Sequence, residues 1–343
     1  MNNFNTKKKI SITTYFYSNN FGGILQAMSL REFILKRFNT DVHFTKFQPK
    51  SFLFREILKP MMRKRPSIIY EVLKKNIKLY FWRSKNNIPF PDLFLKKNYH
   101  NINIFGSDEI WNFKNHYNGY ENFFFGKFSN AKKISYAVSI GNAKLENIKK
   151  KHFLEINELL KKFSFISVRD SSTCEFVKKI TGKSPPIVLD PCLLENKNFM
   201  DETSLLPEKN KYVVVYGNFF SDENKKKIVE FCNNNKLKIY SLSYFNSWTD
   251  NKVSIHGDEF INYFKNAEMV FTSTFHGIIF SYKFKKNFWF EKDPRKTSKS
   301  AFFLNKLNLT KRYIKYAENF EEKVDYGISE KIFKEWQKFS QDY

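Results

Sequence analysis

The chain has little cysteine, and its cysteines are not spaced to hold a metal or a disulfide framework. Its 343 residues include three, Cys174, Cys192 and Cys232, with no CxxC pair and no Cys/His ligand spacing. Disulfide-rich secreted domains and structural zinc sites both depend on such spacing. We therefore expect a protein of a reduced compartment without a structural zinc site.

Long apolar runs are also missing. The first residues, MNNFNTKKKISITTYFY, do not contain the continuous apolar stretch of a signal peptide. Nowhere does the sequence reach the run of about 18 apolar residues that a membrane-spanning helix needs. We expect a soluble, cytoplasmic protein that is at most peripheral to a membrane.

Acidic residues are outnumbered, with Asp+Glu at 34 against Lys+Arg at 59, so the net charge is +25. This charge favours an anionic partner, which can be a phosphate ligand, an anionic glycan, a lipid surface or a nucleic acid. The basic residues are spread along the chain and form neither a basic arm nor a regular RNA-binding motif. Nucleic acid has the charge alone in its favour, so it is not the expected partner.

Strand and helix patterns alternate through the first half, which predicts a Rossmann-like α/β domain over residues 1–195. An apolar run from Ile10 to Tyr17 is followed by a glycine loop, a helix pattern from Ile24 and the strand-like VHFTKFQ. Residues 50–95 are expected to form a helical insertion in this domain. Further strands are predicted at residues 103–105, 133–138, 165–168 and 186–189.

A second α/β domain is predicted over residues 211–343, after a polar, irregular stretch that marks the boundary. It repeats the strand and helix rhythm, from YVVVYG to AEMVFTS and FHGIIFSYKF. The expected fold is α/β, with two doubly wound Rossmann-like domains facing a cleft. The amphipathic stretch 329–340 is predicted to be a helix and is a candidate to pack back on the N-terminal domain.

The loop SNNFGG is the first candidate binding segment, because ligands of open α/β sheets gather at the carboxyl ends of strands. It places Asn19, Asn20, Gly22 and Gly23 before a helix start, where free N–H groups and the helix dipole favour an anionic or hydroxylated ligand. The loop lacks the spacing of a GxGxxG motif or a P-loop. The alternative is a tight turn that needs glycine.

A second loop, GSDEIW, offers Ser107 and Asp108 directly after a predicted strand. A carboxylate here can accept the proton of an attacking hydroxyl. The alternative is an ordinary helix N-cap.

A third loop, SVRD, places Arg169 directly after a buried strand. A guanidinium at this position can bind a carboxylate or a phosphate through two parallel hydrogen bonds. The alternative is a salt bridge to Asp170 or Asp190.

The fourth loop, STFHG, sets His276 and Gly277 at a strand-to-helix turn, with Ser273 and Thr274 able to cap the helix or donate to an anion. Imidazole can bind phosphate when charged and can transfer a proton near neutral pH. The alternative is a buried histidine that is merely hydrogen-bonded. The other histidines lie in less patterned surroundings: His43, His100, His116, His152 and His256.

Taken in order, the motifs NNFGGILQA, GSDEIW, SYAVSIG, SVRD, the Asp190–Pro191 pair, and TSTFHG with FSYKF resemble those of the polysaccharide pyruvyl transferase family. The resemblance runs from about residue 10 to about residue 310 and is weakest over 50–95. It implies a GT-B-like fold, with the donor phosphoenolpyruvate held largely by the C-terminal half and a sugar acceptor entering from the N-terminal half. It also implies that Arg169 and His276 contact the donor.

The family resemblance implies transfer of a pyruvyl group to hydroxyls of a bacterial surface polysaccharide, such as a capsule or exopolysaccharide, or of its lipid-linked precursor, forming a ketal. This chemistry requires no cofactor and no metal. A lipid-linked oligosaccharide acceptor would bring the protein into peripheral contact with the inner face of the membrane.

One position departs from the family pattern, because Thr274 stands where several branches carry arginine. Lys283, Lys285, Lys286 or Arg295 could supply the missing charge. The departure keeps open the alternative of a GT-B glycosyltransferase that uses a nucleotide-sugar donor. A non-catalytic glycan or nucleic-acid binder is the alternative from another class.

Overall fold

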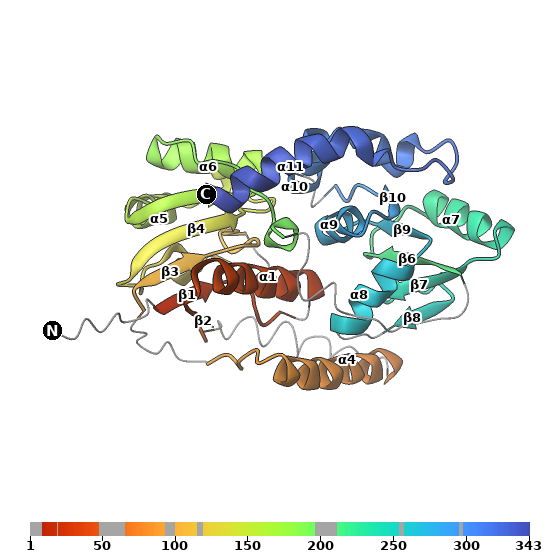
Figure 1. Cartoon of the computed structure of the whole chain (residues 1–343), viewed down its shortest axis with the longest axis horizontal. Coiled ribbons are helices and arrows are strands. Elements are labelled where there is room, and N and C mark those ends of the chain that lie inside the picture. The colour runs from red at the N-terminus through yellow and green to blue at the C-terminus, as the bar shows by residue number, and fades with distance from the viewer. Residues whose placement is uncertain are drawn as a thin grey trace. The chain divides into compact units, whose positions relative to one another are not determined.

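The computed structural model describes residues 9–18, 20–47, 66–92, 100–114, 119–195, 211–253, 257–294 and 298–343. The chain divides into two compact units. The first comprises Met1–Ser18, Gly23–Arg63 and Asn87–Leu194, and the second comprises Asn19–Gly22, Lys64–Asn86 and Glu195–Tyr343. Each unit contains one five-stranded sheet in which all strand pairs are parallel (Figure 1). This confirms the prediction of two doubly wound α/β domains.

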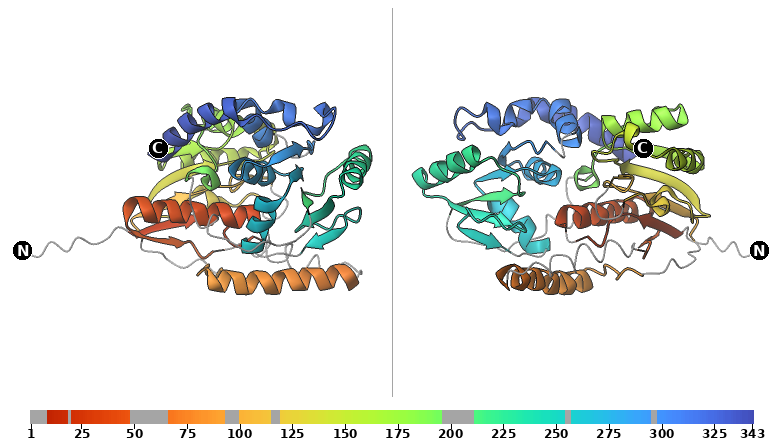
Figure 2. Two further views of the ribbon diagram at one scale, coloured as in Figure 1. Left: turned by 45° about the vertical axis from the view of Figure 1, so that its right-hand side comes forward. Right: turned by 180° about the vertical axis from the view of Figure 1, so that it is seen from behind.

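The first sheet has the strand order β2-β1-β3-β4-β5. Its strands are β1 (Lys9–Thr13), β2 (Asp41–Phe44), β3 (Ile102–Phe105), β4 (Lys132–Val138) and β5 (Phe163–Val168), and its helices are α1 (Phe21–Phe38), α5 (Lys150–Leu160) and α6 (Ser171–Thr181). The order reverses between β1 and β3, so right-handed crossovers place α1 and α5 on opposite faces (Figure 2). Such a reversal opens a crevice at the carboxyl ends of the two strands, where ligands of this architecture bind.

The second sheet has the order β10-β9-β6-β7-β8 and reverses between β6 and β9. Its strands are β6 (Tyr212–Tyr216), β7 (Lys238–Leu242), β8 (Asn251–Val253), β9 (Met269–Thr272) and β10 (Asn287–Phe290). Its helices are α7 (Asp222–Asn234), α8 (Gly257–Asn266), α9 (Phe275–Lys283), α10 (Ser298–Lys306) and α11 (Tyr326–Asp342). Helix α11 contains the predicted stretch 329–340. Its packing on the N-terminal domain stays a prediction.

Strand β6 is buried on both faces, which explains its uninterrupted apolar sequence. Val213 and Val215 lie in one core cluster with Ile228 of α7. On the other face, the ring of Tyr216 contacts Phe260 of α8, with centroids 5.1 Å apart. The alternation along β6 therefore anchors helices on both sides of the second sheet.

Helix α4 (Pro66–Lys85) lies in the region expected as an insertion of the N-terminal domain, but it groups with the second unit. The contact that explains this grouping is Trp82, whose Nε1 donates a hydrogen bond of 2.9 Å to Asp258 in α8. The rest of the predicted insertion at 50–65 and 93–95, and the predicted boundary stretch 196–210, lie outside the described residues. In the part of the chain that the structure describes, no helix is both long and apolar enough to cross a membrane.

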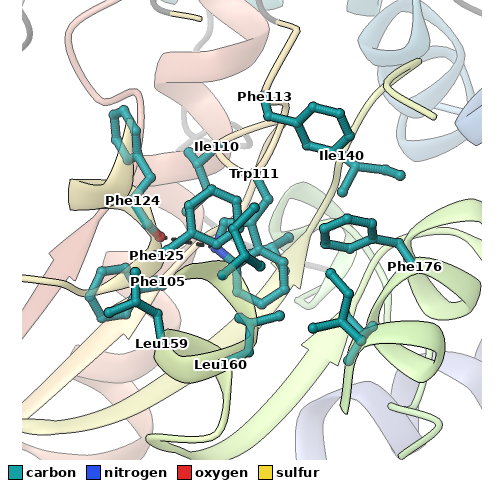
Figure 3. Close-up of a cluster of buried hydrophobic side chains, with 14 of the residues drawn as sticks. Phe105, Ile110, Trp111, Phe113, Phe124, Phe125, Ile140, Leu159, Leu160 and Phe176 are labelled. Carbon is teal, nitrogen blue, oxygen red and sulfur yellow. Dashed lines mark hydrogen bonds between the residues drawn. The ribbon is translucent and has the colours of Figure 1, made fainter. Parts of the chain in front are cut away.

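Trp111 is at the centre of the apolar core on one face of the first sheet (Figure 3). Its ring is fully buried and stacks on Phe125, with centroids 5.6 Å apart. Its Nε1 donates a hydrogen bond of 2.9 Å to the carbonyl oxygen of Phe124. Because Trp111 ends the GSDEIW motif, this core fixes the loop that follows β3.

Replacing Trp111 by phenylalanine keeps an aromatic ring but removes the Nε1–H group that donates to the Phe124 carbonyl. We expect the free energy of unfolding to fall by about 1–3 kcal/mol, because a buried acceptor loses its partner. Urea denaturation followed by circular dichroism measures this loss. The exposed Phe128→Leu is the control and should change stability by less than about 0.5 kcal/mol. If Trp111→Phe were as stable as Phe128→Leu, the hydrogen bond from Trp111 to the Phe124 carbonyl would not stabilise the fold.

Candidate functional site

In the first unit, polar groups gather at the carboxyl ends of β1 and β3, where the strand order reverses. Thr14 follows β1, and its Oγ1 donates a 2.9 Å hydrogen bond to the carbonyl of Ser107 after β3. Gln26 of α1 donates from Nε2 to Thr14 Oγ1 at 3.1 Å. These bonds join the two strand ends and the first helix at the place where this topology binds ligands.

Arg169, at the end of β5, is buried between two carboxylates. Its Nη1 lies 2.8 Å from Asp190 Oδ2, and its Nη2 lies 3.3 Å from Asp108 Oδ1. Nη1 also donates to Ser107 Oγ at 3.4 Å. Burial lowers the pKa of the guanidinium, but Asp190 and Asp108 outweigh it and the pKa is raised overall. The predicted alternative, a salt bridge to Asp190, is therefore present, and a contact with the donor stays a prediction.

Asp108 is the carboxylate of this cluster that solvent can reach. Its side chain is 13% exposed, against 0% for Asp190. Asp108 has a positive φ of 78°, and its Oδ1 accepts a 2.8 Å hydrogen bond from the backbone N–H of Glu109. No helix follows it within residues 100–114, so it is not a helix cap. A Cβ added to Gly23, in the first turn of α1, would lie 3.2 Å from Asp108 Oδ2.

Asp170, the other predicted alternative partner of Arg169, caps α6 instead. Its Oδ1 accepts from the backbone N–H of Thr173 at 2.8 Å, which is the usual N-cap bond. Its Oδ2 accepts from Ser139 Oγ at 2.6 Å. Asp170 therefore ties the loop after β4 to the start of α6.

Truncating Asp190 to alanine would leave the Arg169 guanidinium buried without its shortest ion pair. We expect a loss of about 3–5 kcal/mol in the free energy of unfolding, as for other broken buried pairs. Chemical denaturation compares it with Glu158→Ala, which breaks an exposed pair with Lys161 and should cost under about 1 kcal/mol. If Asp190→Ala lowered the free energy of unfolding no more than Glu158→Ala does, the pair between Arg169 and Asp190 would not stabilise a buried charge.

In the second unit, close backbone packing shapes the equivalent edge between β6 and β9. Gly217 follows β6 with φ of 136°, and a Cβ there would collide with Ser273 Oγ. Ser273 Oγ accepts a 3.2 Å hydrogen bond from the backbone N–H of Phe219. Thr274 caps α9, because its Oγ1 accepts from Gly277 N–H at 3.1 Å. The predicted residues after β9 are thus assembled at the N-terminus of a helix.

His276 is buried in the first turn of α9 and packs against the SNNFGG segment at Gly22, in the first turn of α1. A Cβ added to Gly22 would collide with its imidazole ring. The ring also stacks on Phe280, with centroids 6.1 Å apart. Asn20 holds this loop, because its Oδ1 accepts from Gly22 N–H at 3.1 Å and from the Tyr216 hydroxyl at 3.2 Å. Two segments predicted separately therefore meet within the second unit, whereas Asn19 lies outside the described residues.

Glu291 at the same edge was not predicted. It follows β10, and its backbone N–H donates to the Thr272 carbonyl at 2.8 Å. Its Oε2 accepts from Asn224 Nδ2 at 2.5 Å, and burial raises the pKa of its carboxyl group. The rule used for the other loops, a polar residue directly after a strand, would have found it.

The sequence matches the family described as polysaccharide pyruvyl transferase over residues 20–290. The chain belongs to the polysaccharide pyruvyl transferase family. The family resemblance is thereby confirmed, and the protein is a transferase. None of the curated proteins matches the sequence.

Solved structures similar to the chain have GT-B-type folds. Staphylococcus aureus MnaA, solved with UDP, is 9% identical with a TM-score of 0.49, and the match covers 98% of this chain and 94% of that one. UDP-GlcNAc 2-epimerase from Neisseria meningitidis, bound to UDP-GlcNAc, is 8% identical with a TM-score of 0.45, covering 96% and 99%. Escherichia coli heptosyltransferase WaaC with ADP is 11% identical with a TM-score of 0.41, covering 86% and 89%.

The cations expected to replace the family's arginine at Thr274 are engaged elsewhere or lie outside the described residues. Arg295 lies outside the described residues. Burial lowers the pKa of Lys286. The partners are the Glu195 carbonyl for Lys283, the Glu330 carboxylate for Lys285 and the Lys265 carbonyl for Lys286.

Within the described residues, no group of three or more His, Cys, Asp or Glu side chains could hold a metal ion.

The cap on α9 gives Thr274 a structural role that arginine would not fill. Replacing it by alanine should lower the free energy of unfolding by about 1 kcal/mol, because Gly277 N–H loses its acceptor. Thr274→Ser keeps the hydroxyl and should stay near the wild-type value. Thermal unfolding of the two variants tests this, and an unchanged midpoint for Thr274→Ala would show that the cap contributes nothing.

Proposed function

We propose that the protein transfers the pyruvyl group of phosphoenolpyruvate to hydroxyls of a surface polysaccharide or its lipid-linked precursor, forming a ketal. The family match over residues 20–290 is the observation that carries this proposal. The proposal goes beyond family membership in two respects, because it names phosphoenolpyruvate as the donor and a ketal as the product.

The donor's anionic groups would bind at the edge where β6 and β9 end. Phosphoenolpyruvate carries a phosphate and a carboxylate, and the N-terminus of α9 presents backbone N–H groups and the positive end of a helix dipole. His276 lies in the first turn of this helix, and Ser273 directly precedes its cap. An imidazolium here would add a charged donor to the same anion.

In the proposed reaction, an acid protonates the methylene carbon of phosphoenolpyruvate, and the central carbon becomes cationic. A sugar hydroxyl adds to that carbon and loses its proton to a base. The bond between the central carbon and the phosphate oxygen then breaks, and phosphate leaves with the electron pair. A second hydroxyl adds, loses its proton and closes the cyclic ketal. Stabilisation of the developing charge would dominate these steps.

Asp108 is the group that we assign to accept a hydroxyl proton. It is an acceptor-only carboxylate, it is partly exposed, and it lies at a strand-order reversal. Arg169 and Asp190 hold it in place. Arg169 would contact the donor from its position between Asp108 and Asp190, where its side chain is 2% exposed.

A nucleotide-sugar donor is the second candidate. The observation that favours it is Thr274, which provides a cap and no charge where family branches carry arginine. Phosphoenolpyruvate would then lose one expected ionic contact, whereas a sugar nucleotide depends less on a single charge.

Thermal unfolding with phosphoenolpyruvate, and separately with UDP, GDP and CMP, tests the donor. At a concentration of about 100 times Kd, a true ligand should stabilise the folded state by about 2.7 kcal/mol. We expect phosphoenolpyruvate alone to do so and His276→Gln to lose the effect. Stabilisation by a nucleotide alone would overturn the proposal in favour of a glycosyltransferase.

The matched control is His43→Gln, because His43 is an exposed histidine of β2. This variant should respond to phosphoenolpyruvate as the wild type does. Arg169→Lys keeps a positive charge beside Asp190 and is preferable to alanine, and its unfolding midpoint without ligand shows whether the fold survives. Acceptor-dependent release of phosphate then measures turnover, which should fall at least about 100-fold in Asp108→Asn.

A further inference from the structure

Helix α4 is held to the second unit by one of its faces. Leu79 and Trp82 on this face are buried. The Trp82 indole donates to Asp258 at 2.9 Å, and a Cβ added to Gly257 would collide with the same ring. The helix therefore lies beside α8 in a defined orientation (Figure 1).

The opposite face of α4 exposes a stripe of large apolar side chains. Tyr70, Leu73, Ile77 and Phe81 are 63%, 41%, 57% and 66% exposed. Their spacing of three, four and four residues places them on one side of an α-helix. We call these four residues the α4 stripe. Soluble proteins normally put charged or polar residues on the outward face of a surface helix, so this stripe indicates an interaction surface.

The charges of α4 favour a negatively charged partner. Its sequence, PSIIYEVLKKNIKLYFWRSK, has five basic residues and one acidic residue. Lys74 is exposed beside the stripe, with its Nζ 5.9 Å from the Tyr70 ring centroid. Lys78 and Lys85 pair with carboxylates of α8 at 3.5 Å. Such long, partly exposed pairs are weak, so both lysines retain much of their attraction for an anionic surface.

We propose that the α4 stripe docks on an anionic lipid bilayer, with the helix lying in the plane of the interface. A helix of 20 residues with aromatic and aliphatic side chains on one side and lysines at its flank is the pattern of an interfacial helix. Aromatic rings suit the depth of the lipid headgroups, and each lysine near an anionic surface strengthens binding by about fivefold.

A second copy of this chain fits the same surface poorly. Each copy carries a net charge of +25, and two α4 helices would bring their lysines together. Repulsion between like charges opposes such a dimer, whereas anionic headgroups neutralise the same lysines. The occupant that satisfies both the apolar stripe and its charge is therefore a bilayer with negative headgroups.

Docking would bring the transferase to acceptors that are linked to a lipid. This part of the inference rests on the proposed function, because it identifies the acceptor as a lipid-linked saccharide. The bilayer contact itself rests only on α4. Vesicle binding needs neither donor nor acceptor, so a failure of docking and a failure of pyruvyl transfer can be told apart.

Co-sedimentation of the full chain with vesicles tests the docking. We expect binding to phosphatidylcholine vesicles that contain phosphatidylglycerol, and little binding to phosphatidylcholine alone. The double variant Ile77→Glu/Phe81→Glu should reduce partition at least about tenfold, because two charges replace the apolar contact. Lys74→Ala should weaken it by about fivefold.

The matched control is Phe128→Glu/Leu154→Glu, which places the same charges at exposed apolar positions of the first unit. It should bind vesicles as the wild type does. Failure of the wild type to bind, or binding by Ile77→Glu/Phe81→Glu equal to that of the control, would overturn the proposal. A wild-type dimer that this variant converts to a monomer, seen by sedimentation velocity, would overturn it in favour of a second copy.

Discussion

A buried guanidinium between two carboxylates holds together the edge of the first sheet. Arg169 is almost fully shielded from water, and a charge in that position costs several kcal/mol unless its partners remain in place. The loop after β3 and the segment around Asp190 are therefore bound to the end of β5. As a consequence, Asp108 is kept in one orientation while part of its carboxylate stays open to solvent.

In the second unit, close packing at glycines shapes the equivalent edge. Glycines allow backbone and side chains to approach where any Cβ would collide, as at Gly217 beside Ser273 and at Gly22 beside His276. The two sheets have different strand orders, yet each assembles its polar loops at the reversal of that order. Electrostatic pairing positions one set of groups, and steric fit positions the other.

At position 274, where several branches of the family carry arginine, this chain has a neutral threonine. Thr274 caps α9, and Lys283 at the end of this helix and Lys285 just after it contact other groups. In α4, by contrast, basic residues accompany an exposed apolar stripe. The lysines at and after the end of α9 and the basic residues of α4 therefore lie in different local environments and can be substituted independently.

Local pattern in the sequence predicted the α/β alternation, most of the strands of the first sheet and the family, because periodicity and turn chemistry depend on neighbouring residues. The strand expected at residues 186–189 is wrong, because this segment forms only an isolated bridge between Ile187 and Val168. Tertiary structure alone decided which groups meet. Asp170 and Asp190 were equal candidates to pair with Arg169, and only side-chain direction gave one the helix cap and the other the guanidinium. The grouping of α4 with the second unit likewise depends on Trp82 reaching Asp258, 176 residues away. Contacts at such separations follow from strand order and packing, which no local pattern encodes.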